Sequence, residues 1–206
     1  MRPRPQQARA IQKRQSLLDC ARMEFEEKGF EKATARTIAE RAGVATGTFY
    51  QYFSNKDELL RELTDQRFAE HFANIEVPSV RDVQAMARDN LRPLFQQVLE
   101  YLYAFHAEEK GFHSVLDQRR GADPLLDNRI REHESVLLAR TEQVIRRAGV
   151  RPAEPVAYCV FSMAEGLVHR HVHHPLTSIN FSELAEMGAQ ILVDYVESSR
   201  QGGRRT

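Results

Sequence analysis

The seven residues Thr46–Tyr52 (TGTFYQY) combine small, polar and aromatic side chains in a way that suits binding. At helical spacing, Phe49 and the following Phe53 lie on one side, which leaves the other side to Thr, Gly, Gln and Tyr. These side chains can reach base edges or phosphate oxygens, and no acidic residue among them repels phosphates. The segment therefore predicts nucleic-acid binding. The alternative is an ordinary helical hairpin in a core, which the polar run TFYQYF disfavours.

The residues around this segment predict two further short helices. Thr34 can begin the first by accepting the backbone N–H of Arg36 or Thr37. Gly43 follows that helix at a turn that favours a residue tolerant of positive φ. Ser54, with an acid three residues later, is expected to begin the third helix. A short helix, a turn with Gly and a second helix are typical of a helix-turn-helix.

The stretch TIAERAGVATGTFYQYFSNKDELL, preceded by LLDCARMEFEEKGFEKAT, resembles the DNA-binding domain of the TetR/AcrR family of bacterial transcription regulators. The resemblance implies a three-helix DNA-binding head, a helical ligand-binding and dimerising body, and repression relieved by a small molecule. Two positions depart from the family pattern. Ala45 stands where Ser commonly caps the recognition helix, so Thr46 is expected to take that role. Glu24 stands where an apolar residue is common.

Charge is unevenly distributed along a chain whose formal net charge is zero. Residues 1–14 contain five basic residues and no acid, whereas residues 15–60 contain more acidic than basic residues. The basic arm, with Pro3 and Pro5, is predicted to be disordered alone and to order on phosphates, the alternative being a solubilising tail. Lys56, at the start of a helix, also suits a phosphate. The predicted DNA contacts are Arg9, Lys13, Arg14, Thr34, Arg36, Thr37, Thr46, Gly47, Thr48, Tyr50, Gln51, Tyr52 and Lys56.

Apolar spacing and helix-boundary residues predict helices throughout, and no strand alternation occurs in the sequence. The predicted fold class is all-α, with an N-terminal three-helix helix-turn-helix DNA-binding domain and a C-terminal helical ligand-binding and dimerisation bundle. The predicted divisions are an arm and DNA-binding domain at 1–55, a connecting helix and body at 56–199, and a flexible tail at 200–206. The predicted helices cover 8–28, 34–42, 46–53, 54 to the break at 74–78, 79–108 interrupted near Pro93, 111–120, 124–148, a helix from Pro152 or Pro155 to before Pro175, and a last one from about Asn180.

The last helix carries an apolar stripe with small residues that permit close helix approach. The family resemblance implies that the last two helices pair with their copies in a homodimer, although the small residues could equally serve packing inside one chain. A two-fold DNA site needs two reading heads at a fixed spacing, which favours the dimer. The predicted dimer contacts are Leu184, Met187, Gly188, Ile191 and Tyr195.

Aromatic and polar residues of the body are candidates for lining an effector pocket, with ordinary core packing as the alternative for each. These residues are Phe68, Phe72, Met86, Phe95, Tyr103, Phe112, Tyr158, Phe161, Glu165 and His169. Glu165 and His169 would orient a ligand. The expected effector is small and mostly apolar, which follows from the family resemblance.

The histidines of HRHVHH suggest metal binding as a second kind of site. His169 and His173 are four residues apart, and Glu165 lies one turn earlier, so three donors share one helical face. A zinc site needs a further donor from another helix, such as His106, His113 or His133, and nothing in the sequence places one nearby. The sequence therefore predicts no bound metal and no cofactor. It contains no GxSxG, P-loop or GxGxxG motif, which disfavours an enzyme.

Composition sets the remaining limits. The chain has 206 residues, 42% of them hydrophobic, which is enough for a substantial core. No apolar run approaches the roughly 20 residues that span a bilayer, and no secretory signal is present, so a cytoplasmic protein is expected. Cys20 and Cys159 show no metal or redox spacing.

These features predict a DNA-binding transcriptional repressor. Its expected partners are a palindromic double-stranded DNA operator, a second copy of the chain and a small-molecule effector, with no membrane and no catalytic residue. The alternative is a metal-responsive regulator, or a helical metal- or ligand-binding protein that uses Glu165, His169 and His173.

Overall fold

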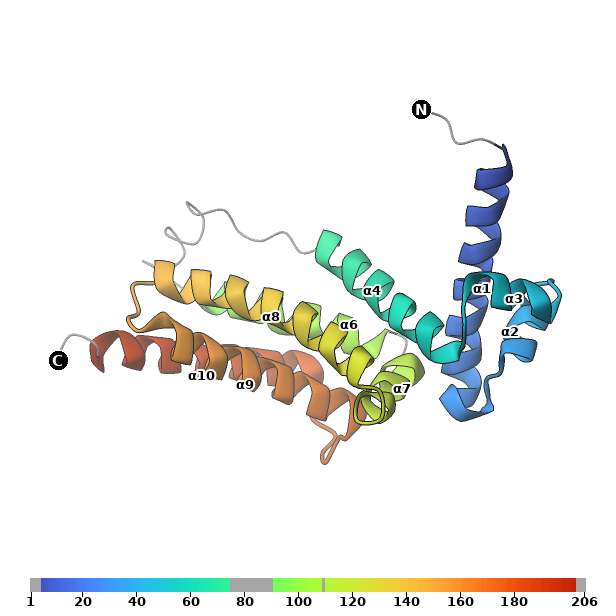
Figure 1. The fold of residues 1–206 in the computed structure, drawn as a ribbon. Helices are drawn as coiled ribbons and strands as arrows, with labels where there is room; N and C mark the ends of the chain where they lie inside the picture. The colour runs from blue at the N-terminus through green and yellow to red at the C-terminus, as the bar shows by residue number, and fades with distance from the viewer. Residues whose placement is uncertain (1–4, 75–90, 109, 203–206) are drawn as a thin grey trace. The chain divides into compact units, whose positions relative to one another are not determined.

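The computed structural model describes residues 5–74, 91–108 and 110–202, which fold into helices without a strand among them (Figure 1). This confirms the predicted all-α class. The helices are α1 (Pro5–Lys32), α2 (Ala35–Arg41), α3 (Thr46–Tyr52), α4 (Lys56–Asn74), α6 (Arg92–Ala107), α7 (Lys110–Arg120), α8 (Pro124–Arg147), α9 (Ala153–His173) and α10 (Phe181–Gly202).

The chain forms two compact units. The N-terminal unit comprises Met1–Phe72 and Glu109–Arg131, and the C-terminal unit comprises Ala73–Glu108 and Glu132–Thr206. The boundary predicted after residue 55 separates DNA-binding from effector functions and stays a prediction about function. The two compact units divide the chain elsewhere, because most of α4 and all of α7 belong to the same unit as α1, α2 and α3.

The core of the N-terminal unit begins on α1. Leu17, Leu18, Ala21 and Phe25 are fully buried, as their helical spacing predicted. Gly29 interrupts α1 with φ 75° and ψ 167°, a conformation that glycine adopts without steric cost, so the predicted helix end there is confirmed. At its other end α1 starts at Pro5, earlier than the predicted residue 8.

Helix α7 packs against α1 in the same unit. The Glu26 carboxylate accepts the backbone N–H of Gly111 at 2.9 Å and that of Phe112. These two N–H groups belong to the first turn of α7, where no intrahelical acceptor exists for them. The Phe112 ring is fully buried and stacks on Phe25 with centroids 6.5 Å apart. Glu26 therefore caps a helix that lies 85 residues further along the chain.

Several predicted helix boundaries agree with the structure. Asp123 accepts the backbone N–H groups of Leu125 and Leu126 at 3.0 and 3.2 Å, which begins α8 at Pro124 as expected. Helix α6 has Pro93 in its first turn, and the residues before Leu91, on which the predicted break inside a longer helix depends, lie outside the described residues. The break at 74–78 and the helix predicted from Ser79 lie largely outside the described residues. Helix α10 continues to Gly202, which corrects the flexible tail predicted from residue 200.

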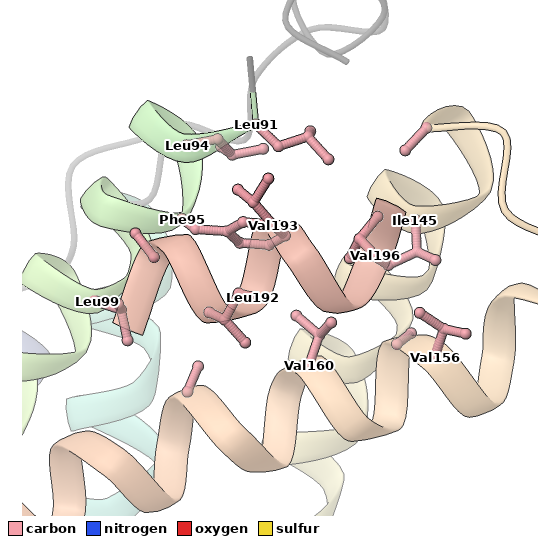
Figure 2. Packing of buried hydrophobic residues seen from close by; sticks show 14 of the residues in the cluster. Leu91, Leu94, Phe95, Leu99, Ile145, Val156, Val160, Leu192, Val193 and Val196 are labelled. Carbon is pink, nitrogen blue, oxygen red and sulfur yellow. The ribbon is translucent and has the colours of Figure 1, made fainter. Parts of the chain in front are cut away.

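The C-terminal unit is built around α6, α9 and α10, with α9 and α10 side by side (Figure 1). Apolar side chains from these helices and from the end of α8 meet in one cluster (Figure 2). The residues labelled there are Leu91, Leu94, Phe95, Leu99, Ile145, Val156, Val160, Leu192, Val193 and Val196. Burial of such side chains supplies the main free energy that holds the helices together.

In the part of the chain that the structure covers, no helix is both long enough and apolar enough to cross a membrane.

Candidate nucleic-acid interface

Two threonines fix the start of α2. The Thr37 N–H donates to Thr34 Oγ1 at 3.1 Å, and the Thr34 N–H donates to Thr37 Oγ1 at 3.0 Å. This reciprocal pair is a capping box, and it confirms the predicted cap. The hydroxyl groups of Thr34 and Thr37 are thus engaged in helix initiation, and their contact with DNA stays a prediction.

The turn between α2 and α3 has the geometry that Gly43 predicted. Gly43 adopts φ 66°. Its N–H donates to the Glu40 carbonyl at 3.1 Å, and the Val44 N–H donates to the Ala39 carbonyl at 3.0 Å. This bond pattern is a Schellman motif, which requires a left-handed residue at the glycine position. The turn therefore fixes how α3 leaves α2.

Helix α3 has one buried side and one exposed side. Phe49 and Phe53 are 0% and 1% exposed, whereas Tyr50 is 59% exposed. Gly47, one turn before Tyr50, and Gln51, one turn after Gly47, are also exposed. Thr46, Thr48 and Tyr52 lie half-buried beside it. The exposed stripe of Gly47, Tyr50 and Gln51 is called the reading face below.

Ala45 is the N-cap residue of α3, and no side chain caps it. Thr46 was expected to cap the helix, but it is the first helical residue, so that expectation is wrong. The helix start is held by the backbone instead, through the Thr48 N–H and the Ala45 carbonyl at 2.8 Å. The Thr46 hydroxyl is therefore not consumed by capping.

Helix α4, which was predicted to begin at Ser54, begins later, at Lys56. The Glu58 N–H donates to Asn55 Oδ1 at 2.9 Å, and the Ser54 N–H donates to Glu58 Oε2 at 2.7 Å. The cap thus uses Asn55 and Glu58, one residue after the predicted pair Ser54 and Asp57. Asp57 instead accepts a 2.7 Å hydrogen bond from Arg119 on α7.

Lys56 holds the end of α1. Its Nζ donates to the carbonyls of Phe30 at 2.7 Å and Ala33 at 3.3 Å, and it lies 4.1 Å from the centroid of the Phe30 ring. Two of its three N–H donors are engaged in this way. These carbonyls are open because α1 ends at Lys32, and the predicted phosphate contact of Lys56 stays a prediction.

The basic residues of α1 lie on a helix. The prediction of a disordered arm is wrong from Pro5 onward, because proline suits a first helical turn and the Gln, Ala, Arg and Lys that follow favour helix. Arg9 and Lys13 are exposed one turn apart, and no ion pair engages them among the described residues. Arg14 is paired with Glu62 and lies 5.1 Å over the Phe53 ring.

The cations of α2 are paired as well. Arg36 Nε lies 2.8 Å from Glu40 Oε1 on the exposed surface. Arg41 Nε lies 2.8 Å from Glu24 Oε1, and Arg41 also contacts Glu27. Among the described residues, Arg9 and Lys13 thus remain two exposed cations on α1 outside any ion pair, and the reading face itself is neutral.

Glu24, which departs from the family pattern, is 1% exposed. Besides Arg41, it accepts hydrogen bonds from Lys28 Nζ at 2.8 and 2.9 Å. Burial by itself would raise the pKa of Glu24, but hydrogen bonds from Lys28 and Thr37 and the charges of Lys28 and Arg41 outweigh burial and lower it. The ionised carboxylate ties α1 to α2, which explains an acid at an ordinarily apolar position.

The model of bacterial regulatory proteins of the tetR family matches residues 17–63, the segment that contains the capping box, the turn and the reading face. Residues 17–63 of this chain are thus a DNA-binding segment of the tetR-family type.

Curated relatives match this chain over part of its length. The transcriptional repressor KstR2 of Mycobacterium tuberculosis is 33% identical over 100 residues, which is 47% of this chain and 47% of KstR2. The match thus spans about half the length of either protein.

Solved structures match the fold over most of the chain. A TetR transcription regulator from Haloarcula marismortui aligns with a TM-score of 0.71 at 18% identity, covering 92% of this chain and 98% of that one. The fatty acid degradation regulator FadR of Bacillus halodurans aligns with a TM-score of 0.61 at 17% identity, covering 93% and 96%. At these identities the likeness shows the fold alone.

The predicted pocket residues do not form one group. Phe68 and Phe112 are buried in the N-terminal unit, and Phe95 lies in the core of the C-terminal unit. Tyr158 is 61% exposed, which contradicts its place in a pocket. Met86 and the side chain of Phe72 lie outside the described residues.

The remaining pocket candidates all belong to α6 and α9. Tyr103 stacks on Phe181 with centroids 3.9 Å apart. Phe161, Glu165 and His169 are half-buried on α9. Their role toward an effector stays a prediction.

The predicted dimer stripe divides into two faces. Met187 and Ile191 are 59% and 58% exposed, so they are available to a partner. Gly188 faces inward: a Cβ there would lie 2.7 Å from Leu167 Cδ2 and 3.1 Å from a Leu99 carbon, both in the same unit.

Leu184 and Tyr195 are half-buried, and Tyr195 packs against the core cluster. The alternative of packing inside one chain thus holds for Gly188. That finding corrects the assignment of Gly188 to the dimer interface.

Proposed function

We propose that this chain is a DNA-binding transcriptional repressor whose reading face enters the major groove. The observation that carries the proposal is that α3 has one buried side and one exposed side. Phe49 and Phe53 anchor the helix in the core, and Gly47, Tyr50 and Gln51 stand outside it. A phenol, an amide and a bare backbone offer hydrogen bonds and close approach without negative charge.

Gly47 supports this assignment separately. A Cβ at Gly47 would meet nothing within 4 Å, and its φ is not positive. Neither packing nor backbone geometry inside the chain therefore requires glycine there. A close approach by another molecule gives it a reason, and a DNA backbone beside the start of α3 is such a molecule.

Arg9 and Lys13 are proposed to contact phosphates on either side of the groove, since both are exposed cations on α1. The protein acts as a homodimer on a palindromic operator, through the exposed Met187 and Ile191 of α10. The proposed location is the cytoplasm, and no catalytic activity is proposed.

Control by an effector completes the proposal. A small, mostly apolar molecule binds the C-terminal unit and favours a state in which α4 tilts. The two reading faces of the dimer then no longer fit successive major grooves, and the repressor leaves its operator. A helical metal- or ligand-binding protein without a DNA role is not favoured, because the family match covers the DNA-binding segment itself.

A mobility-shift titration on DNA flanking the gene tests the reading face. Tyr50→Ala is expected to weaken operator binding by about 1–3 kcal/mol, the usual worth of a base contact. The fold should persist, because Tyr50 is 59% exposed. Met23→Ala is the matched control, since Met23 is a large residue of α1 that is 50% exposed.

Tyr50→Phe separates the hydroxyl group from the ring. If the hydroxyl reads a base, Tyr50→Phe should lose affinity nearly as Tyr50→Ala does. Parental affinity in Tyr50→Ala, or an equal loss in Met23→Ala, would remove the reading face from the proposal.

A further inference from the structure

Three charged residues of α4 lie on one stripe, because they follow one another at intervals of four. Their charges alternate, in the order Asp57, Arg61, Asp65. Each is paired with a residue of α7 or of the beginning of α8, where the charges alternate in the opposite order, Arg119, Asp123, Arg129. These three ion pairs are called the charge ladder below. All six residues belong to the N-terminal unit.

The middle pair of the charge ladder is the most deeply buried of the three. Arg61 Nη1 lies 2.7 Å from Asp123 Oδ2, and the two side chains are 16% and 9% exposed. The other oxygen of Asp123 accepts the first N–H groups of α8, so one carboxylate both begins α8 and binds α4. Burial alone would raise the pKa of Asp123, but hydrogen bonds from Leu126 and Arg61 outweigh burial and lower the pKa. The carboxylate is therefore ionised at neutral pH.

The outer pairs extend this contact in both directions along α4. Arg119 Nη2 lies 2.7 Å from Asp57 Oδ1, and the Arg119 guanidinium also lies 4.4 Å from the centroid of the Phe30 ring on α1. Arg129 pairs with Asp65, two turns further along α4. At 1.5 Å per residue, the charge ladder spans about 12 Å of the helix. A tilt of α4 by itself would pull at least one of the outer pairs apart.

Alternating charge permits one register of α4 against its neighbours. If α4 slid by one turn in one direction, Arg61 would meet Arg119. A slide in the other direction would bring Asp57 to Asp123. In either case attraction is replaced by repulsion, which a row of like charges on each side would not produce. One-turn shifts of packed helices are one way in which proteins switch between states, and the charge ladder opposes such a shift.

We propose that the charge ladder holds α4 in the register that binds operator DNA, so that α4, α7 and the beginning of α8 move as one body. The proposal rests on the proposed repressor function and specifies its control. The state that leaves the operator carries α7 and the beginning of α8 along with α4. Operator affinity then depends on the fraction of molecules in which the charge ladder is closed.

Reversing one charge of an outer pair tests the proposal on the flanking DNA used for Tyr50→Ala. Asp65→Arg should lower operator affinity by about 2–30-fold, because the attraction of a part-exposed pair is lost and a similar repulsion is added. The variant gains positive charge, which by itself favours DNA, so general attraction to phosphates cannot explain a loss. Adding Arg129→Asp restores the pair with its charges exchanged and should recover most of the affinity.

Arg61→Asp is the stronger perturbation, since two carboxylates would then face each other with little water between them. It should lose more operator affinity than Asp65→Arg. Circular dichroism and urea unfolding check that each variant is folded. If Arg61→Asp does not fold, Asp65→Arg and its reversal decide.

Glu142→Arg is the matched control. It makes the same change of charge as Asp65→Arg and also breaks an ion pair, but one that joins Glu142 to Arg146 within α8. It should bind the operator at least as well as the parent. An equal loss of affinity in this control would overturn the proposal.

Hydrogen exchange without DNA tests the charge ladder apart from the repressor function. In Asp65→Arg, the amides of α4 beyond residue 60 and those of residues 119–131 should exchange faster by a common factor, because a helix released from its neighbours loses most of its stability. Adding Arg129→Asp should restore both segments. A parent that binds none of the flanking DNA would refute the repressor function, and the exchange rates would still show whether α4 is held.

Three results would overturn the proposal. The first is parental exchange in Asp65→Arg. The second is parental operator affinity in the folded Asp65→Arg and Arg61→Asp variants, even with a lower urea midpoint, because the ion pairs would then serve stability alone. The third is a loss of affinity that Arg129→Asp does not recover.

Discussion

Gly111→Ala is expected to destabilise the N-terminal unit, although it adds one methyl group near a helix start. A Cβ at Gly111 would lie 2.7 Å from the backbone oxygen of Glu26 and 2.9 Å from its carboxylate carbon. Ordinary carbon contacts require about 3.5–4.0 Å, so one of the two helices must move or the carboxylate must turn away.

Both responses are costly. If α1 moves relative to α7, the added methyl group overpacks their contact, and such backbone shifts cost about 1–3 kcal/mol. Turning the Glu26 carboxylate away abandons its bonds to the N–H groups of Gly111 and Phe112, and hydrogen bonds to a charged group contribute about 1.5–3 kcal/mol. The better helix propensity of alanine returns up to about 1 kcal/mol. The expected net loss is about 1–3 kcal/mol.

Urea unfolding followed by circular dichroism measures this change. Gly121→Ala is the control: Gly121 follows the same helix, a Cβ there meets nothing within 4 Å, and its φ is not positive. That variant should unfold at the parental midpoint or slightly above it. If Gly111→Ala also unfolds at the parental midpoint, the close approach of α1 and α7 is not as described.

Two further predictions concern charge. The pKa of Glu24 is lowered in the folded state, so its ionisation stabilises the fold above its unfolded pKa, and this stabilisation disappears as pH falls through the folded pKa. Glu24→Gln should therefore flatten the acid side of a plot of urea midpoint against pH. Parallel curves for parent and variant would contradict this. Replacing both Met187 and Ile191 with Glu should give a folded monomer by light scattering, with operator binding lost, because both residues are exposed in one chain; a dimeric mass would place the interface elsewhere.

Local chemistry made the helix boundaries readable from the sequence. Gly43 and Asp123 each have one physical role that their neighbours determine, and both adopt it. The start of α4 shows where this reasoning stops. Ser54 with Asp57 and Asn55 with Glu58 both match the capping pattern, one residue apart. The choice depends on Asp57 bonding to Arg119, which lies 62 residues away.

Long-range contacts also explain the misread side chains. Lys56 has the sequence context of a phosphate ligand, and in the fold it also donates to the carbonyls of Phe30 and Ala33 at the end of α1. His106 is one histidine in an apolar helix, and its spacing says nothing about Glu165. Tyr158 lies in the apolar segment of α9, yet its side chain is 61% exposed. Sequence periodicity gives the face of a residue on its own helix and does not say which helix covers that face.

The cap that Glu26 places on α7 bears on protein engineering. Exchanging DNA-binding heads between tetR-family members would ordinarily join residues 1–60 of one protein to the remainder of another. In this chain such a chimera would take Glu26 and Phe25 from one parent and Phe112 from the other. Since Phe112 is buried against Phe25, a chimera keeps this contact only if the segments that carry the two residues come from the same parent. A functional hybrid needs residues 109–131 to travel with the head.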